Sequence, residues 1–233
     1  MRRERDDSED IARVRVFIDH WEFSLSWQIA YSGFTRRKLT ASDLENAQVE
    51  SQKIEWKLLP DIILEHLDEV EYIKDSPKEL RNVDVYASAR NSGNQKADND
   101  FRNWLEKELD PLPGFEVYHF PRKKLKRSVQ CKGCGASLDR PELEKGLKTK
   151  MACDLLSYAV EDLYDIGVLF ADDPELSPSV LCVQEIFDKK IIHIGLKSRG
   201  QTLRSAAWGH VLLNDLMKDL FKPHDFGNKR TRK

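Results

Sequence analysis

The chain has 233 residues, of which 40% are hydrophobic and 33% charged, with a formal net charge of −2 at pH 7. This composition allows a core beneath a solvated surface, and the near balance of charge excludes a molecule that binds polyanions over its whole surface. The sequence has no run of about 18 apolar residues, and its charged start, MRRERDDSED, lacks the apolar segment of a signal peptide. We therefore expect no membrane partner, and four cysteines without such a signal favour a reducing, cytoplasmic location.

Apolar, β-branched runs alternate along the chain with segments of helical spacing. The runs predict five strands, at residues 13–19, 82–88, 115–120, 166–171 and 190–195. Helical spacing predicts helices over 41–59, 97–109, 147–163, 177–188 and 203–221, with a helical continuation over 62–70. Such alternation predicts a three-layer α/β/α, Rossmann-like fold with a mostly parallel sheet of about five strands and right-handed crossovers. The nearly continuous apolar run IGVLFA suits a strand buried on both faces.

Polar and basic segments suggest where this domain begins and ends. Residues 1–12 and the basic end, 223–233, are predicted to be flexible tails around one domain at 13–222. Within it, residues 121–146 are basic, contain glycine and lack a clear period, so we interpret them as an insertion.

Carboxylates follow two of the predicted strands. Asp19 ends the first strand, and Asp172, Asp173 and Glu175 follow the fourth, while Asp154 lies in the preceding helix. Ligands of parallel sheets bind beyond the carboxyl ends of the strands, and crowded like charges there are costly unless a cation neutralises them. Oxygen ligands of this kind suit Mg²⁺ or Mn²⁺, which can activate water and stabilise charge on a phosphodiester. The alternative is that each aspartate caps the helix that follows it.

Two stretches, VFIDHWEF and EKGLKTKMACDLLSYAVEDLYDIGVLFADDPELSPSV, resemble the NYN domain family of PIN-like nucleases. That family typically shows FID-x-x-N, then K-G-V-D-x-x-x-x-x-D-L-L in a helix, then a strand ending in S-G-D-S-D-F-x-P. The resemblance covers roughly residues 13–195. It implies a Rossmann-like, PIN-like fold and an enzyme that hydrolyses RNA with Mg²⁺ or Mn²⁺. By position it implies that Asp19, Asp154, Asp173 and Glu175 are catalytic. Asp19, Asp154 and Asp173 would hold the metal, with Asp172 as an additional acid.

The sequence departs from the family motifs at four positions. Glu22 stands where the family has asparagine, Lys148 replaces an aspartate, Asp172 replaces a glycine, and Glu175 replaces an aspartate. A lysine near a metal would weaken cation binding or would instead contact a scissile phosphate. The leading hypothesis is therefore a metal-dependent endoribonuclease.

The alternative is a catalytically attenuated nucleic-acid-binding or assembly module of the same fold. A third hypothesis is a phosphatase or nucleotide hydrolase on the same acids. The sequence contains neither a P-loop motif nor a dinucleotide-binding fingerprint.

The insertion carries two further candidate sites. Cys131 and Cys134 form a C-x-x-C pair, which is compatible with a zinc knuckle, with a surface hairpin of reduced thiols, or with a zinc site shared across a homo-oligomer. A basic cluster precedes the pair and is predicted to bind the phosphate backbone of single-stranded RNA, together with Lys148; the alternative is a solvated surface. The cluster consists of Arg122, Lys123, Lys124, Lys126 and Arg127. Trp21, Trp27 and Tyr31 follow the first strand and are expected to stack bases or to pack in the core.

Overall fold

One sheet of seven strands organises the computed structural model, in the order β6-β3-β2-β1-β7-β8-β9. Six of these strands are mutually parallel, and β6 is antiparallel to β3. The order reverses between β1 and β7, so the carboxyl ends of these two strands form a topological switch point. The strands are β1 (Ala12–Asp19), β2 (Lys78–Arg90), β3 (Phe115–Lys123), β6 (Leu143–Glu144), β7 (Ile166–Phe170), β8 (Lys190–Gly195) and β9 (Gly209–Leu212), with a separate pair, β4 (Val129–Gln130) and β5 (Ser137–Leu138). The structure describes residues 11–40, 43, 47–71, 73, 76–90, 95–123, 129–130, 133–134, 137–138 and 143–220.

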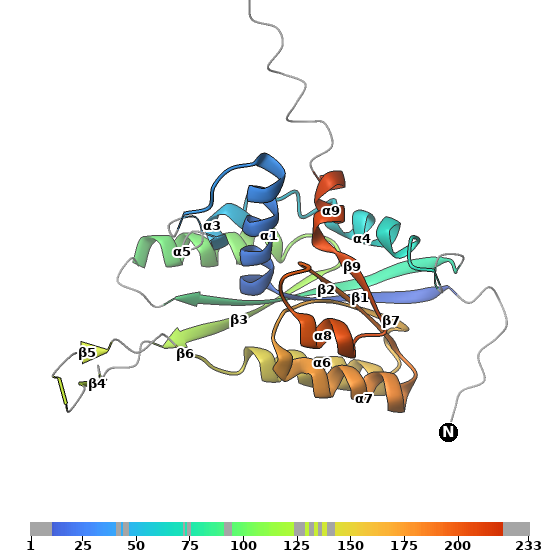
Figure 1. Cartoon of the computed structure of the whole chain (residues 1–233). Helices are drawn as coiled ribbons and strands as arrows, with labels where there is room; N and C mark the ends of the chain where they lie inside the picture. Colours follow the sequence, from blue (N-terminus) through green and yellow to red (C-terminus); the bar gives the residue numbers. More distant parts are fainter. Residues whose placement is uncertain are drawn as a thin grey trace, which may run out of the picture.

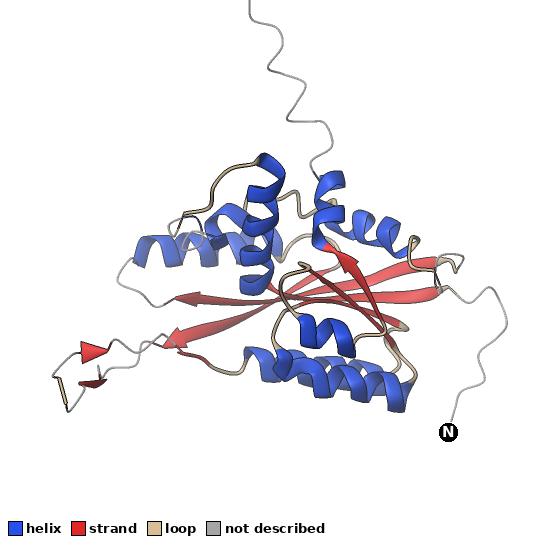
Figure 2. Cartoon of the chain, in the orientation of Figure 1, coloured by secondary structure: helices blue, strands red, loops and turns tan. Residues whose placement is uncertain are grey.

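Helices cover both faces of this sheet, as Figures 1 and 2 show. One layer contains α1 (His20–Thr35), α3 (Ala47–Ser51), α4 (Leu59–Leu67), α5 (Gln95–Trp104), the π-helix η1 (Leu105–Leu109) and α9 (Leu213–Leu220). The other contains α6 (Leu147–Val160), α7 (Ser177–Phe187), α8 (Gln201–Ala206) and the 3₁₀ turn η2 (Pro174–Leu176). The expected three-layer α/β/α, Rossmann-like fold is therefore confirmed.

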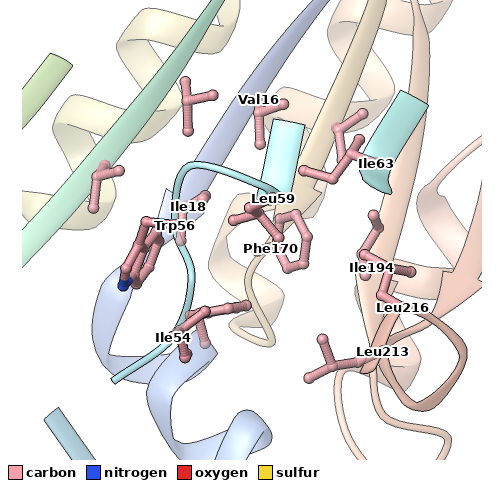
Figure 3. Close-up of a cluster of buried hydrophobic side chains, with 14 of the residues drawn as sticks. Val16, Ile18, Ile54, Trp56, Leu59, Ile63, Phe170, Ile194, Leu213 and Leu216 are labelled. Carbon is pink, nitrogen blue, oxygen red and sulfur yellow. The ribbon is translucent and has the colours of Figure 1, made fainter. Parts of the chain in front are cut away.

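The alternation of side chains along the strands divides the core into two clusters. Val16 and Ile18 belong to the cluster beneath α1 and α4, which Figure 3 shows, whereas Phe17 belongs to the cluster beneath α6 and α7. Strand β7 contributes to both clusters, with Phe170 on the first side and Leu169 on the second. The prediction that IGVLFA is buried on both faces is confirmed, and burial of both faces fixes β7 at the centre of the sheet.

Two predicted helices have a different structure, and one helix was not predicted. The helix expected over 203–221 is wrong, because strand β9 separates α8 from α9. The helix expected over 41–59 is also wrong: α3 covers only Ala47–Ser51, and Pro60 lies in the first turn of α4, where its missing N–H costs no hydrogen bond. Helix α1 was not predicted from the sequence, since its serines and aromatic residues have low helix propensity.

A buried ion pair joins β1 to β2 on the face that α6 covers. A bulge in β2 shifts the register, so that Val14 pairs with Leu80 but Arg15 pairs with Asn82. Arg15 donates from Nε and Nη2 to the two carboxylate oxygens of Asp84, over 2.6 and 2.8 Å. Burial raises the pKa of Asp84 above its ordinary value, although Arg15 opposes this shift. The pair therefore depends on both partners remaining charged.

Replacing Asp84 with alanine is expected to lower the free energy of unfolding by about 3–5 kcal/mol, because Arg15 would remain buried without its counter-ion. Urea denaturation of the two proteins measures this difference. The control is Glu50→Ala, which removes the exposed ion pair with Lys53 and is expected to change stability by less than about 1 kcal/mol. Equal effects of the two substitutions would contradict a structural role for the buried pair.

Candidate functional site

Two of the predicted acids lie where the sheet order reverses, and each caps the element that follows it. Asp19 is the last residue of β1, and its Oδ1 accepts a hydrogen bond of 3.0 Å from the backbone N–H of Glu22 in α1. Asp173 follows β7, and its Oδ1 accepts one of 2.9 Å from the backbone N–H of Glu175. The capping alternative is therefore confirmed for both residues. Each cap uses one carboxylate oxygen.

The second oxygens of these two acids face Lys148. The Lys148 ammonium lies 2.5 Å from Asp19 Oδ2, 2.8 Å from Glu22 Oε1 and 3.7 Å from Asp173 Oδ2. Lys148 belongs to the first turn of α6, which begins after Gly146 at a positive φ of 96°. Carboxylates from the ends of β1 and β7 and from the start of α1 therefore converge on one amino group.

Burial and charge act in opposite directions on this group. Burial favours the neutral amine, but the carboxylates of Asp19 and Glu22 outweigh it and raise the pKa of Lys148. Burial raises the pKa of Glu22, and the charge of Asp19 raises it further, while Lys148 lowers it. Lys148 is thus protonated at neutral pH and is the counter-ion of the acid cluster, which we define as Asp19, Glu22 and Asp173.

Asp172 is held by different partners. Its backbone N–H donates to Glu22 Oε2 over 2.6 Å, so Glu22 bridges Lys148 and the turn after β7. The Oδ2 atom of Asp172 accepts hydrogen bonds from Ser26 Oγ at 3.1 Å and from Arg199 Nε at 2.7 Å. Its carboxylate charge is therefore paired with a guanidinium.

Asp154 lies on the α6 face of the sheet with other partners. Its Oδ2 accepts a hydrogen bond of 2.7 Å from the hydroxyl of Tyr86, and its Oδ1 accepts one of 2.5 Å from Lys150. Tyr86 is the register partner of Asp19 across β1 and β2, so Asp154 of α6 contacts the strand position next to Asp19. Glu175 is exposed, and its backbone rather than its side chain contacts Asp173.

The acid cluster has the oxygen donors that Mg²⁺ or Mn²⁺ prefers, but the Lys148 ammonium lies where these donors converge. A divalent cation bound to the same carboxylate oxygens would lie next to the Lys148 ammonium, and the two positive charges would repel each other. Among the residues that the structure describes, no group of three or more His, Cys, Asp or Glu side chains is arranged to hold a metal ion. The observed arrangement therefore does not fit a divalent ion while Lys148 is in place.

The predicted nucleic-acid and zinc residues are described only in part. Arg122 and Lys123 end strand β3, at the same carboxyl edge of the sheet as the acid cluster. Cys134 is an exposed free thiol. Lys124, Lys126, Arg127 and Cys131 lie outside the described residues.

Of the aromatic residues after β1, Trp27 belongs to the core, Tyr31 packs against it, and Trp21 is half-buried. Trp27 is buried and packs against Phe23, so the expectation of a core role is confirmed for this residue. His20 is buried as well, with its Nε2 3.2 Å from Ser51 Oγ and its ring stacked on Trp56. Neither side chain lies on an open surface where a base could stack.

Tyr86 and Arg199 were not predicted from the sequence as residues of the site, whereas Glu22 was noted as a departure from the resembled family. Glu22 lies one helical turn after Asp19, and that spacing was a usable signal for a second acid at the same place. Tyr86 could have been found from the strand pairing of β1 with β2. Nothing near Arg199 in the sequence connects it with Asp172, because the turn after β8 brings them together.

Comparisons with known proteins identify no function. No family model matches the chain, and no curated protein matches it. A crystal structure of a protein of unknown function from Vibrio parahaemolyticus is similar, with 17% sequence identity and a TM-score of 0.45. The match covers 91% of this chain and 98% of that chain. Within the described residues, no helix has the length and apolar character needed to cross a membrane. The resemblance to the NYN domain family stays a prediction.

Replacing Lys148 with methionine is expected to destabilise the protein by about 3 kcal/mol at pH 7.5, because three carboxylates would lose their counter-ion. The raised pKa of Glu22 means that its protonated form favours the folded state. That contribution is present at acid pH and is lost as pH rises through the folded pKa. Without Lys148 the pKa of Glu22 in the folded state rises further. The loss of stability caused by Lys148→Met should therefore be larger at pH 7.5 than at pH 5. Urea denaturation at both pH values measures it.

The matched control is Lys150→Met, two residues along the same helix. Lys150 is paired with Asp154, whose other oxygen keeps its bond to Tyr86. This substitution is expected to cost less than about 1 kcal/mol, since the Lys150 side chain is 39% exposed. A Lys148→Met deficit that is the same at both pH values would contradict the counter-ion role.

Proposed function

We propose that this chain is a catalytically attenuated, RNA-binding module with a PIN-like fold. The observation that carries the proposal is the position of the Lys148 ammonium among Asp19, Glu22 and Asp173. The Lys148 ammonium neutralises carboxylates as a metal ion does. Unlike a metal ion, it has no coordination position for water and cannot lower the pKa of a bound water. The acids therefore serve to hold the switch point together.

The carboxyl edge of the sheet supports RNA as the partner. Strand β3 ends there with Arg122 and Lys123, and the sequence continues with Lys124, Lys126 and Arg127. Clustered positive charge attracts a phosphate backbone whatever the base sequence. Lys148, by contrast, is engaged with carboxylates, so in this proposal it does not bind phosphate.

The second candidate function is a metal-dependent endoribonuclease with Asp19, Asp154, Asp173 and Glu175 as its catalytic residues. The convergence of carboxylates from β1 and β7 favours it. Bound Mg²⁺ or Mn²⁺ would supply an activated water and charge stabilisation at a phosphodiester. This function requires Lys148 to leave the acid cluster.

We also infer a reducing, cytoplasmic location, which the free thiols of Cys134, Cys153 and Cys182 support. A zinc site at Cys131 and Cys134 and a homo-oligomer remain expectations of the sequence. Metal analysis of the purified protein, with Cys131→Ser as the control, tests the first, and sedimentation analysis tests the second.

The purified chain is expected to bind single-stranded RNA without cleaving it, in Mg²⁺ or Mn²⁺. Affinity should fall roughly 10- to 100-fold between 50 and 200 mM salt, because several phosphate contacts release counter-ions. Fluorescence anisotropy measures binding, and gel analysis of an end-labelled RNA measures cleavage. Cleavage that Asp19→Asn and Asp173→Asn both abolish would instead establish the nuclease. No binding at either salt concentration would overturn the module.

Replacing Lys148 with aspartate is expected to create a site for Mn²⁺, since it removes the internal cation and adds a fourth carboxylate to the acid cluster. Isothermal titration calorimetry should detect Mn²⁺ binding to the Lys148→Asp variant and none to the unaltered chain. Lys150→Asp is the matched control and should bind no better than the unaltered chain. Equal Mn²⁺ binding by the unaltered chain would show that Lys148 yields to a metal, as the nuclease requires.

A further inference from the structure

A second candidate site lies between η1 and β3, on the sheet face opposite α6. The cavity there has a volume of about 50 Å³, enough for roughly four water molecules. Its lining combines cationic, anionic, aromatic and apolar groups from α5, η1 and β3. The lining residues are Arg102, Leu105, Glu106, Asp110, Val117 and His119.

Hydrogen bonds at Asp110 hold the backbone of η1 and of β3 on the two sides of this cavity. The N–H of Asp110 donates to the carbonyl of Leu105 over 2.9 Å, which closes the wide turn of the π-helix. The carboxylate of Asp110 accepts a hydrogen bond of 2.9 Å from the backbone N–H of Val117 in β3. Short π-helical segments frequently occur at functional sites, and here the wide turn lies beside the cavity. The groups that line it are therefore held on ordered elements.

The chemistry of the lining is complementary to one nucleobase edge. Arg102 supplies donors, and Glu106 supplies carboxylate acceptors. Partial burial and the charge of Arg102 lower the pKa of His119, so its ring is neutral at pH 7 and suited to stacking. Along its Watson–Crick edge, guanine presents an acceptor at O6 for an arginine, next to N–H donors at N1 and N2 for a carboxylate.

The strand register places this cavity near the proposed RNA path. Tyr118, the neighbour of His119, pairs with Tyr86, which pairs with Asp19. The cavity therefore lies two strands along the sheet from β1, on the face opposite α6. Arg122 follows His119 by three residues in the same strand, at the end of β3 from which the basic cluster continues. A strand of RNA whose phosphates contact the basic cluster could insert a base here.

We propose that the cavity lined by Arg102, Glu106 and His119 binds the edge of a guanine base from single-stranded RNA. This inference rests on the proposed RNA-binding function and adds base preference to it. The phosphate contacts supply affinity for any sequence, whereas the cavity discriminates between bases.

The test compares Glu106→Gln with Glu108→Gln, two exposed acids on the same π-helix, of which only Glu106 lines the cavity. Anisotropy titrations use oligonucleotides of uridine with and without one central guanosine, and with inosine in its place. We expect guanosine to bind roughly tenfold tighter than uridine or inosine, as one good base-edge contact allows. Glu106→Gln should remove this preference, and Glu108→Gln should keep it.

Guanosine monophosphate, titrated alone and followed by protein NMR, separates this inference from the proposed function. Binding of the nucleotide that Glu106→Gln weakens, without binding of any oligonucleotide, would support the pocket and overturn the RNA-binding module. Equal affinity for all the oligonucleotides would overturn the pocket and leave the module supported. If Glu106→Gln and Glu108→Gln both lost the preference for guanosine equally, the pocket would also be overturned. The preference would then not depend on the contact with Glu106.

Discussion

The ion pairing of Lys148 with Asp19, Glu22 and Asp173 is the interaction on which the centre of this structure depends. Parallel strands bring their carboxyl ends to one edge of the sheet, so acids after β1 and β7 become neighbours because of topology alone. Their mutual repulsion in a partly buried place has to be neutralised. A lysine from α6 supplies that charge from within the chain, so folding and neutralisation occur together.

Helix α6 makes a series of polar contacts along the same face of β1 and β2. Side chains two residues apart in a strand share one face, so Arg15 and Asp19 both lie beneath α6, as do Asp84 and Tyr86. Three of them have a partner in α6: Arg15 contacts Tyr158, Tyr86 donates to Asp154, and Asp19 pairs with Lys148. Each contact is specific to one position along the helix. Together with the apolar packing of Leu147, Met151 and Leu155, they fix how α6 docks. The geometry of the acid cluster is thus a consequence of this docking.

The predictability of the fold from the sequence follows from the strength of its local signals. Long apolar runs such as IGVLFA identify buried strands without any tertiary information. Strand β9 has only four residues, GHVL, and its place beside β8 depends on pairing that no local pattern encodes. Asp19 caps the start of helix α1, and Phe23 and Trp27 pack one side of the helix into the core. These tertiary contacts stabilise α1 although its residues have low helix propensity.

The site shows the same division. Asp19 and Asp173 could be predicted because strand ends and sheet topology determine their position. Lys148 was conspicuous from the sequence only as a departure from the resembled family, and its contact with three carboxylates required the docked position of α6. Arg199 and the cavity beside η1 gave no signal, since both depend on turns that bring distant segments together.

The charge of the acid cluster also determines where a polyanion can approach. The acid cluster contains three carboxylic acids and one ammonium, so its carboxylates outnumber its internal cation. Asp172 adds no further repulsion, because Arg199 pairs with it. In the proposed RNA-binding module, this charge repels phosphates from the switch point, whereas the basic residues of the cluster that begins at the end of β3 attract them. The proposed guanine pocket lies beside η1 and His119, on the sheet face opposite α6, and is therefore separate from the acid cluster. Selectivity for a base can then develop there, independently of any chemistry at the acids.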